Sequence, residues 1–437
     1  MSDSHSVRHV ADTAQSERIP ASGTLAWAFY DWASSAFAAV IITFVFATYF
    51  SQGIASDPVT GTAQWGWAMT VSAMFAAVLG PILGAFADAI GRRKPWIFVL
   101  TWLCIIATSL LWFAEPSVEW VLFALIAVVV ANLALELAGI FYNAMLSDLT
   151  SAGRMGRLSG WSWALGYVGG ICCLLIALFG LVQTEAPLFG LNKDTAEHVR
   201  ATGPLVALWL ALFSLPLFLF TPDRQGTGLS MSEALSEGLQ QLRRTVTHLK
   251  RYKQIAHFLL ARMLYIDGLN TLFAFGGIYA AGTFGFELAD VITFGILLNV
   301  TAGLGAFAFA WIDDWLGSKP VILIALAGLF VCGLAAVLVQ NEMHFWIVGS
   351  LLGIFVGPTQ AASRTLMAKL SPPEQQTEMF GLYALSGKIT AFLGPFIVGT
   401  VTLWADSQRV GMTTILLFFA AGFALLLALQ VRPRDEA

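Results

Sequence analysis

Long apolar runs alternate with short polar segments along almost the whole chain of 437 residues. A helix that crosses the hydrocarbon core of a bilayer needs about 20 consecutive, mostly apolar residues. Twelve runs meet this requirement, and each predicts a membrane-spanning helix because backbone polar groups in lipid must be satisfied within the segment. They lie near residues 25–50, 64–88, 96–114, 119–147, 158–182, 202–220, 255–282, 288–313, 319–340, 343–368, 378–403 and 410–431.

The polar segments divide the chain into domains. Residues 1–24 have no apolar core and no small-residue cleavage site, so we interpret them as a disordered arm and not as a signal peptide. Residues 221–254 separate the runs into two sets of six and form the predicted linker. This organisation predicts an N-terminal bundle over 25–220, a C-terminal bundle over 255–431, and a short tail at 432–437.

The linker contains a predicted amphipathic helix. Ser230 and Glu233 have the spacing of a capping box at its start. We expect the helix to lie along the inner face of the membrane, with a solvated connector as the simpler alternative. Its apolar positions recur at helical spacing opposite a basic cluster; they are Leu235, Leu239, Leu242, Val246 and Leu249, against Arg243, Arg244, Lys250 and Arg251.

Composition and charge support a multi-pass membrane protein. Hydrophobic residues make up 57% of the chain and charged residues 11%, well below the roughly 25% charged residues of soluble domains. With the N-terminus inside, 17 of the 23 Lys and Arg residues fall in inner segments. We therefore predict that both termini and the linker are cytoplasmic, in the plasma (inner) membrane if the protein is prokaryotic.

A polar turn after the second run carries the most specific pattern in the sequence. It reads Gly84-Ala-Phe-Ala-Asp88-Ala-Ile-Gly91-Arg92-Arg93-Lys94-Pro95. A carboxylate at this depth can cap the positive N-terminus of a neighbouring helix. An arginine there can pair with a carboxylate, and we assign this role to Arg92.

The same turn recurs in part after the eighth run, as Asp314-Trp-Leu-Gly317-Ser-Lys319-Pro320. Ala310 and Ser318 stand where the first copy has Gly84 and Arg92, so we expect a weaker contact from the second copy. An ordinary charged turn that only sets topology is the alternative for both. The predicted gating residues are Gly84, Asp88, Gly91, Arg92, Asp314, Gly317 and Lys319.

The first and seventh runs also repeat each other. Asp31-Trp-Ala-Ser34-Ser35-Ala-Phe37 and Asp267-Gly-Leu-Asn270-Thr271-Leu-Phe273 share an acid, a small polar pair and a phenylalanine at the same offsets. Internal repeats of this kind are typical of transporters whose two halves are related by pseudo-symmetry.

Several segments together resemble a known family of transporters. The turn from Gly84 to Arg92 resembles the signature loop between helices 2 and 3 of the major facilitator superfamily. Other segments resemble the vacuole-effluxer-like branch, related to the autophagy-linked vacuolar amino-acid exporter of yeasts. These segments are Phe29-Tyr30-Asp31-Trp32-Ala33, Phe141-Tyr142-Asn143-Ala144, Trp163-Ala164-Leu165-Gly166-Tyr167, Asp267-Gly268, Gln360 to Arg364 and Ser386-Gly387-Lys388.

Ionisable residues deep in the membrane cost several kcal/mol, so each is a functional candidate that requires a partner. Asp267 and Lys388 lie at similar depths in the C-terminal half, and we expect them to form an ion pair that is either structural or functional. Glu136 has no cation at matching depth in its own half, which makes it the first candidate for proton coupling. Asp31 is either architectural or part of a binding site, whereas Arg364 is expected to reach the membrane interface.

Uncharged polar residues occupy spans 1, 4, 7 and 10, which the resemblance implies line a central cavity. They either hold the two charged ends of a zwitterion or join helices by hydrogen bonds. The predicted substrate or coupling residues are Asp31, Ser34, Ser35, Glu136, Asn143, Asp267, Asn270, Thr271, Gln360 and Lys388.

These patterns favour secondary transport over catalysis. All six histidines lie outside or at the edges of the runs, and the four cysteines have no metal-ligand spacing, so we expect no catalytic site, metal or cofactor. The resemblance implies two six-helix bundles that expose a central site alternately to each side. It favours the proton-coupled movement of a neutral amino acid or similar zwitterion, with export as the favoured direction. The transporter is expected to work as a monomer without nucleic-acid partners. Sugars, drug-like compounds, lipids and organic anions remain alternative substrates, and a membrane-embedded enzyme or sensor is a distant alternative.

Overall fold

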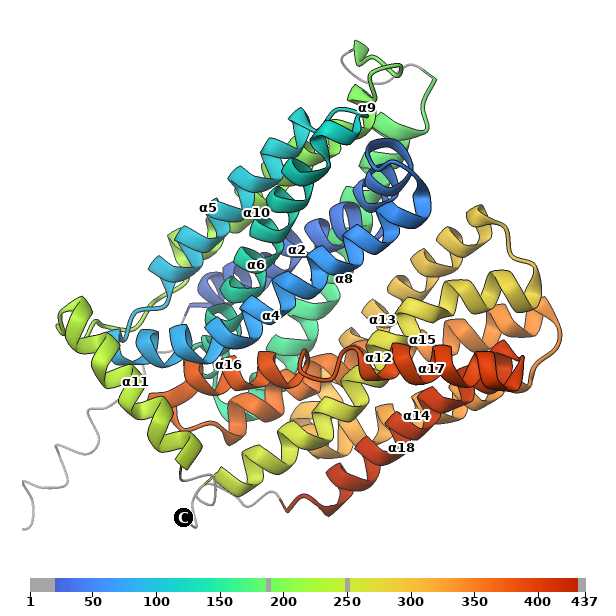
Figure 1. The fold of residues 1–437 in the computed structure, drawn as a ribbon. Helices are drawn as coiled ribbons and strands as arrows, with labels where there is room; N and C mark the ends of the chain where they lie inside the picture. The colour runs from blue at the N-terminus through green and yellow to red at the C-terminus, as the bar shows by residue number, and fades with distance from the viewer. Residues whose placement is uncertain (1–19, 186–189, 248–251, 431–437) are drawn as a thin grey trace, which may run out of the picture.

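The computed structural model describes residues 20–185, 190–247 and 252–430. The predicted tail and most of the predicted arm therefore lie outside the described residues, and helix α2 begins at Ala21. Every regular element within the described ranges is helical (Figure 1).

The first half of the chain folds into six long segments joined by short turns. The first segment consists of α2 (Ala21–Ala36), a π-helical stretch (Phe37–Phe44), α3 (Phe46–Tyr49) and a second π-helical stretch (Phe50–Ile54). The others are α4 (Pro58–Ile90), α5 (Lys94–Leu110), α6 (Val121–Ala144) with α7 (Leu146–Leu149), α8 (Met155–Ala177), and α10 (Thr202–Phe220) preceded by α9 (Glu197–Arg200).

The second half repeats this organisation after the linker helix α11 (Met231–Thr247). Its helices are α12 (Lys253–Phe284), α13 (Leu288–Leu316), α14 (Ser318–Leu338), α15 (Glu342–Leu370), α16 (Gln376–Ser386), α17 (Leu393–Ala405) and α18 (Gln408–Ala428).

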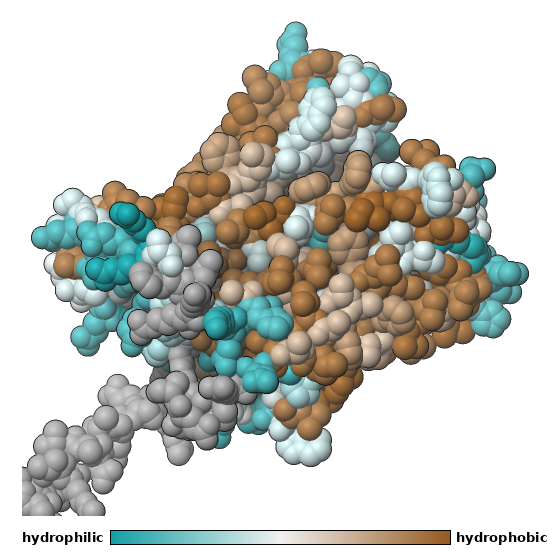
Figure 2. Space-filling model, turned by 60° about the horizontal axis from the view of Figure 1, so that its bottom comes forward, coloured by the Kyte–Doolittle hydropathy of each residue, from teal (hydrophilic) through white to brown (hydrophobic). Residues whose placement is uncertain are grey.

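The predicted spans agree with these helices. Within the described residues, eleven helices are long and apolar enough to cross a membrane, and Leu393–Ala405 is a shorter apolar helix. Hydrophobic residues cover most of the face seen in Figure 2, and hydrophilic residues gather toward its ends. A continuous apolar surface of this size is expected where a protein meets lipid tails.

The eleventh span differs from its prediction. The sequence predicts one helix over 378–403, but the structure has two half-helices, α16 and α17, separated by residues 387–392. Hydropathy does not reveal the interruption, because apolar residues continue through it and only Lys388 is charged. Discontinuous helices in transporters commonly lie at binding sites, since their free ends expose backbone polar groups.

The two halves contact each other most closely at one end of the molecule. Helix α16 packs on α4 and α8 packs on α13, so each pair joins one half to the other. Figure 1 shows the halves converging toward the end where α11 lies and separating toward the end where α9 lies. We call the first end the closed end.

Helix α11 forms as predicted and packs on α4. The capping box is present, because the Ser230 backbone N–H donates to Glu233 (2.9 Å) and the Glu233 N–H donates to Ser230 Oγ (3.4 Å). The hydrogen bonds from Ser230 lower the pKa of Glu233. Leu235 and Leu239 remain exposed on the outer side, which leaves their apolar surface available to a membrane face.

Candidate functional site

Asp88 joins the two halves at the closed end. Its carboxylate accepts hydrogen bonds from the backbone N–H groups of Thr377 (3.1 Å) and Glu378 (2.8 Å), in the first turn of α16. The predicted capping of a neighbouring helix is therefore present, and this helix belongs to the opposite half. Gly84 permits the approach, since a Cβ atom there would lie 2.5 Å from the carbonyl oxygen of Thr377.

The arginine that completes this contact is Arg93, and the expectation for Arg92 is wrong. Arg93 is 1% exposed, donates to Thr377 Oγ1 (2.9 Å) and forms ion pairs with Asp148 and Asp88. Arg92 is exposed. Gly91 ends α4 with a left-handed φ of 89°, and the turn that follows directs the second arginine inward.

The second copy of the turn makes the equivalent contact in the opposite direction. Asp314 accepts a hydrogen bond from the backbone N–H of Gly156 (2.8 Å), at the start of α8. Arg157 of α8 adds an ion pair with Asp314 (2.6 Å). The expectation of a weaker contact is therefore not supported by the geometry, because the opposite half supplies the arginine that this copy lacks.

The remaining residues of the second copy act within their own half. Gly317 has a φ of 91° and connects α13 to α14, a conformation that favours glycine. Lys319 donates to the carbonyl oxygens of Leu427 (3.0 Å) and Leu429 (2.6 Å) at the end of α18. Lys319 thus caps a helix C-terminus and does not bridge the halves.

A buried ion pair between Asp31 and Arg364 lies further inside. Arg364 is 2% exposed, and its Nη1 lies 3.0 Å from Asp31 Oδ2 and 3.3 Å from Asn143 Oδ1. It also donates to the hydroxyl (2.9 Å) and the carbonyl oxygen (2.7 Å) of Ser159. The guanidinium lies among the rings of three residues at 5.1–5.8 Å from their centroids: Trp27, Tyr142 and Trp163.

The prediction that Arg364 reaches the membrane interface is therefore wrong. The first half covers this part of α15, so the side chain meets a carboxylate and aromatic rings instead of headgroups. Asp31 also accepts a hydrogen bond from Ser162. Every partner of Arg364 named above comes from the first half, which makes this ion pair a third connection between the halves.

The expected pair of Asp267 with Lys388 is replaced by a different one. Lys388, in the break between α16 and α17, donates to Glu136 Oε1 of α6 at 2.6 Å. Glu136 thus has a cation partner, although it comes from the opposite half. Asn132 also donates to Glu136 Oε1 (3.2 Å) and to Ser72 (2.8 Å). The Glu136 and Lys388 side chains stay 24% and 34% exposed, so the pair remains accessible.

Asp267 is buried without a side-chain partner among the described residues. It is 2% exposed, and within the described residues only the backbone N–H of Gly394 is placed to donate to its carboxylate. Gly394, in the first turn of α17, is its close neighbour, since a Cβ atom on Gly394 would lie 3.2 Å from Asp267 Oδ1. Five residues earlier on α12, Arg262 donates to the carbonyl oxygen of Tyr383 (2.7 Å) near the end of α16. Helix α12 therefore places an acid and a base at the two free helix ends of the break, each matching the helix dipole.

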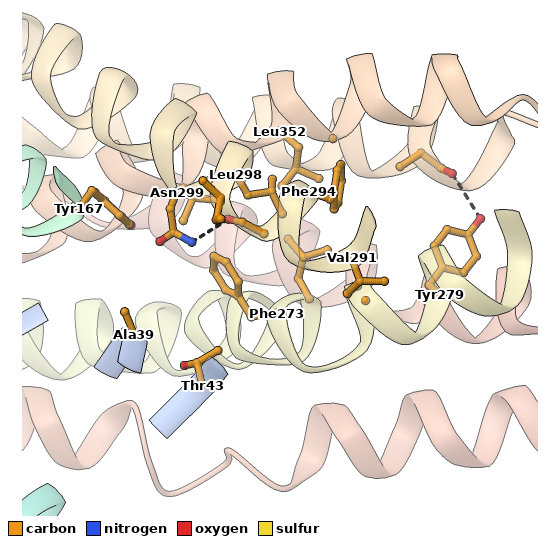
Figure 3. A pocket seen from close by; sticks show the side chains of 18 of the residues that line it. Ala39, Thr43, Tyr167, Phe273, Tyr279, Val291, Phe294, Leu298, Asn299 and Leu352 are labelled. Atoms are coloured by element: carbon orange, nitrogen blue, oxygen red, sulfur yellow. Dashed lines mark hydrogen bonds between the residues drawn. The ribbon is translucent and has the colours of Figure 1, made fainter. Parts of the chain in front are cut away.

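A cavity of about 460 Å³ lies between the halves (Figure 3). It is lined by α2 and the π-helical stretch after it, α8, α12, α13, α14, α15 and α18. Its lining is mainly apolar, and none of its described lining residues is Asp, Glu, Lys or Arg. The polar side chains in its wall include Ser35, Thr43, Tyr167, Asn299 and Gln360.

The uncharged polar residues predicted from the sequence do not form one site in the structure. Ser35 and Gln360 line the cavity, and Gln360 donates to the Tyr167 hydroxyl across the halves (3.3 Å). Asn143 belongs to the Arg364 cluster, Thr271 is buried, and Asn270 is exposed. Ser34 donates to a carbonyl oxygen of its own helix. Asn299 was not predicted, although it is a single amide within an apolar run and that isolation is a usable signal.

Comparison with known proteins identifies the family. A family model described as "Vacuole effluxer Atg22 like" matches residues 62–436. The chain belongs to this family.

Among relatives of this Atg22-like chain, the uncharacterized MFS-type transporter YxiO of Bacillus subtilis is 26% identical over 92% of the chain and 93% of its own length. Autophagy-related protein 22-1 of Penicillium rubens is 25% identical over 64% of the chain, which spans about half the length of that fungal protein.

Solved structures share the fold at low identity. The E. coli fucose:proton symporter FucP is 15% identical with a TM-score of 0.71, covering 94% of this chain and 98% of that structure. The proton:xylose symporter XylE is 14% identical with a TM-score of 0.70, covering 93% of this chain and 94% of that structure. The Atg22-like chain is therefore a secondary transporter with the major facilitator fold and is not an enzyme.

Replacing Arg93 with Gln should shift the Atg22-like protein away from the state with a closed end. A hydrogen bond to a charged group contributes about 1.5–3 kcal/mol, so the population with an open cavity should fall about tenfold or more. The measurement is the rate at which a water-soluble maleimide labels Ala39→Cys in a variant without native cysteines. Arg92→Gln is the matched control, and equal slowing in both variants would show that Arg93 is not the residue that holds this end.

Replacing Arg364 with Gln should destabilise the protein, because it leaves Asp31 buried without its cation. Breaking a buried ion pair on one side costs about 3–5 kcal/mol. Unfolding in detergent should show a smaller loss for Asp31→Asn/Arg364→Gln than the sum of the two single losses. Strict additivity would mean that the two side chains do not depend on each other. Arg364→Lys should not restore stability, since lysine cannot reproduce the guanidinium contacts with Ser159 and Asn143.

Proposed function

We propose that this secondary transporter moves a small zwitterion, preferably a neutral amino acid, in exchange for or together with protons. The ion pair of Glu136 with Lys388 is the observation that carries the proposal. Both partners are partly exposed, they come from opposite halves, and Lys388 stands in a helix break. Broken helices near the middle of the membrane are common places for substrate binding in transporters.

A zwitterion can replace this ion pair without leaving either charge alone. Its carboxylate takes the place of Glu136 beside Lys388, and its ammonium takes the place of Lys388 beside Glu136. A neutral sugar offers hydrogen bonds but no charge to either partner, so separating the pair for it would leave two charges uncompensated. Substrate binding between Glu136 and Lys388 therefore replaces a direct contact between the two halves.

The other two kinds of connection suit a gate better than a substrate site. Arg364 is almost completely buried and has protein partners on all its nitrogens. Asp88 and Asp314 are occupied by backbone N–H groups of the opposite half. We assign these residues, with Gly84, Gly91 and Arg93, to holding the closed end.

Asp267 is the residue we propose for proton coupling, in place of the first choice from the sequence, Glu136. Ionising a buried carboxylate that has no cationic side chain paired with it costs several kcal/mol, so binding a proton is a direct way to stabilise it. Lys388 stands six residues before Gly394 in the same broken span. Losing the proton would let Asp267 compete with Glu136 for Lys388.

Direction and location rest on the relatives and on charge. The family description speaks of an effluxer, which favours export. The distribution of Lys and Arg favours cytoplasmic termini, with the closed end on the cytoplasmic side, and the Bacillus relative favours the plasma membrane. The large inter-half cavity lies within one chain, so we propose that the monomer is the functional unit.

A lipophilic substrate is the second candidate, and the cavity wall favours it. The lining of the 460 Å³ cavity consists mainly of aliphatic and aromatic side chains. Neither Glu136 nor Lys388 is among the lining residues of this cavity, so this candidate does not depend on the ion pair.

Uptake by proteoliposomes with a panel of neutral amino acids tests the zwitterion directly. Glu136→Gln and Lys388→Met should each reduce transport about tenfold or more, because each leaves one substrate charge and one protein charge unpaired. The exchanged pair Glu136→Lys/Lys388→Glu should recover part of the activity. Full activity in both single variants would remove this pair from the site. Transport of lipophilic compounds alone would favour the second candidate.

Replacing Asp267 with Asn should separate proton coupling from substrate movement. Asparagine resembles the protonated acid, so substrate counterflow without a pH gradient should continue, whereas accumulation driven by a pH gradient should be lost. Glu136→Gln provides the comparison, since it should impair both processes. Gradient-driven accumulation at the unmodified level in Asp267→Asn would exclude Asp267 as the coupling acid.

A further inference from the structure

Helices α8 and α13 touch closely over only part of their length. At the closed end their spacing is set by small residues: a Cβ atom on Gly156 would lie 2.6 Å from the Cβ of Asp313, and one on Gly160 would lie 2.6 Å from the Cβ of Ala310. Further along, a Cβ atom on Gly303 would lie 3.2 Å from the Cβ of Tyr167. The contact therefore loosens with distance from the closed end.

A groove of about 510 Å³ lies along this seam. It extends from Trp161 to Cys172 on α8, which corresponds to about 16 Å of helix at the 1.5 Å rise per residue. No charged side chain is among its described lining residues, and Tyr167 and Asn299 bring a hydroxyl and an amide to it. Helix α13 lines it with Val300, Gly303, Leu304 and Phe307.

The groove opens outward and also borders the central cavity. Val168, Leu304 and Phe307 are 48%, 61% and 48% exposed, so this surface meets lipid tails in a membrane-spanning protein. Tyr167, Ile171 and Asn299 line both the groove and the central cavity. The seam between the halves is thus bordered by lipid on one side and by the cavity on the other.

We propose that the acyl chain of a bilayer lipid occupies this groove and acts as a wedge between the two halves. An apolar groove without charged residues can hold hydrocarbon but offers nothing to fix a lipid headgroup, and its outward opening lies in the membrane surface of the protein. The chain extends along α8 and ends against the side chains that separate it from the central cavity. The occupant is a membrane lipid and not the transported solute.

The wedge depends on which side of the transporter is open. Closing the central cavity requires α8 and α13 to approach each other beyond Tyr167 and Gly303, which removes the groove. A ligand that binds one of two conformations shifts the equilibrium toward it, so the bound chain favours the open cavity. This inference uses the proposed function only in requiring that the halves move; it is independent of the substrate and of the coupling ion.

Photoreactive phosphatidylcholine with a diazirine in its acyl chain tests the site in liposomes containing the full-length protein. Cross-links should concentrate in peptides that contain residues 161–172 and 299–307. Val300→Trp, which fills the groove from the lipid side, should reduce them about tenfold. Leu208→Trp is the matched control, because Leu208 is 67% exposed on α10 and lines neither cavity. Labelling spread evenly over the lipid-facing helices, or unchanged by Val300→Trp, would overturn the proposal.

A second measurement examines the conformational effect. This measurement uses a variant that lacks the native cysteines and carries Ala39→Cys. Adding Val300→Trp should leave the rate of maleimide labelling at position 39 at least as high as in the parent, because the indole replaces the acyl chain as a wedge. Slower labelling than in Leu208→Trp would contradict the wedge. Displacement of the photoreactive lipid by an excess of the transported solute would mean that the groove belongs to the substrate and would overturn the assignment to lipid. The cross-link pattern and the labelling rates do not require transport or knowledge of the solute, so they remain valid if the proposed substrate is wrong.

Discussion

The carboxylates of Asp88 and Asp314 each accept hydrogen bonds from the free N–H groups at the start of a helix in the opposite half. Neither a carboxylate nor the end of a helix is stable in an apolar environment by itself, and the two kinds of group satisfy each other here. Because α4 reaches α16 while α13 reaches α8, the two contacts are reciprocal. The close helix approaches at Gly84 and Gly156 and the open cavity beyond them all follow from this arrangement.

Charged side chains deep in this transporter also satisfy each other across the two halves. Asp31 meets Arg364 and Glu136 meets Lys388, and both pairs join the two halves. A charge that is neutralised across a moving interface has to find a new partner, or a ligand, whenever the interface opens. The exception among the described deep acids is Asp267, which has no ion-pair partner among the described residues. A group of this kind is free to respond to protons while the others hold the halves.

The sequence was sufficient for the spans, the duplicated turn and the family, because each depends on a local pattern of residue types. The ion-pair partners were harder to predict, because the depth of a residue along a helix does not determine which side of the helix its side chain faces. Asp267 and Lys388 lie at similar depths, yet the break in their span turns Lys388 toward Glu136. Arg92 and Arg93 are adjacent, and only the geometry of the turn after Gly91 decides which one is buried. For Arg364, no local pattern indicates that the first half covers that end of α15.

The break between α16 and α17 also gives the two parts of the eleventh span different neighbours. By chain order α16 belongs to the second half, but it packs mainly on α4 and α6 of the first half, whereas α17 packs on α18 and α12 of the second. Gly381 and Gly80 bring α16 and α4 so close that a Cβ atom on Gly381 would lie 2.6 Å from the carbonyl oxygen of Gly80. Residues 387–392 are therefore the place where one span passes from the surface of the first half to the surface of the second, and Lys388 lies at that transition.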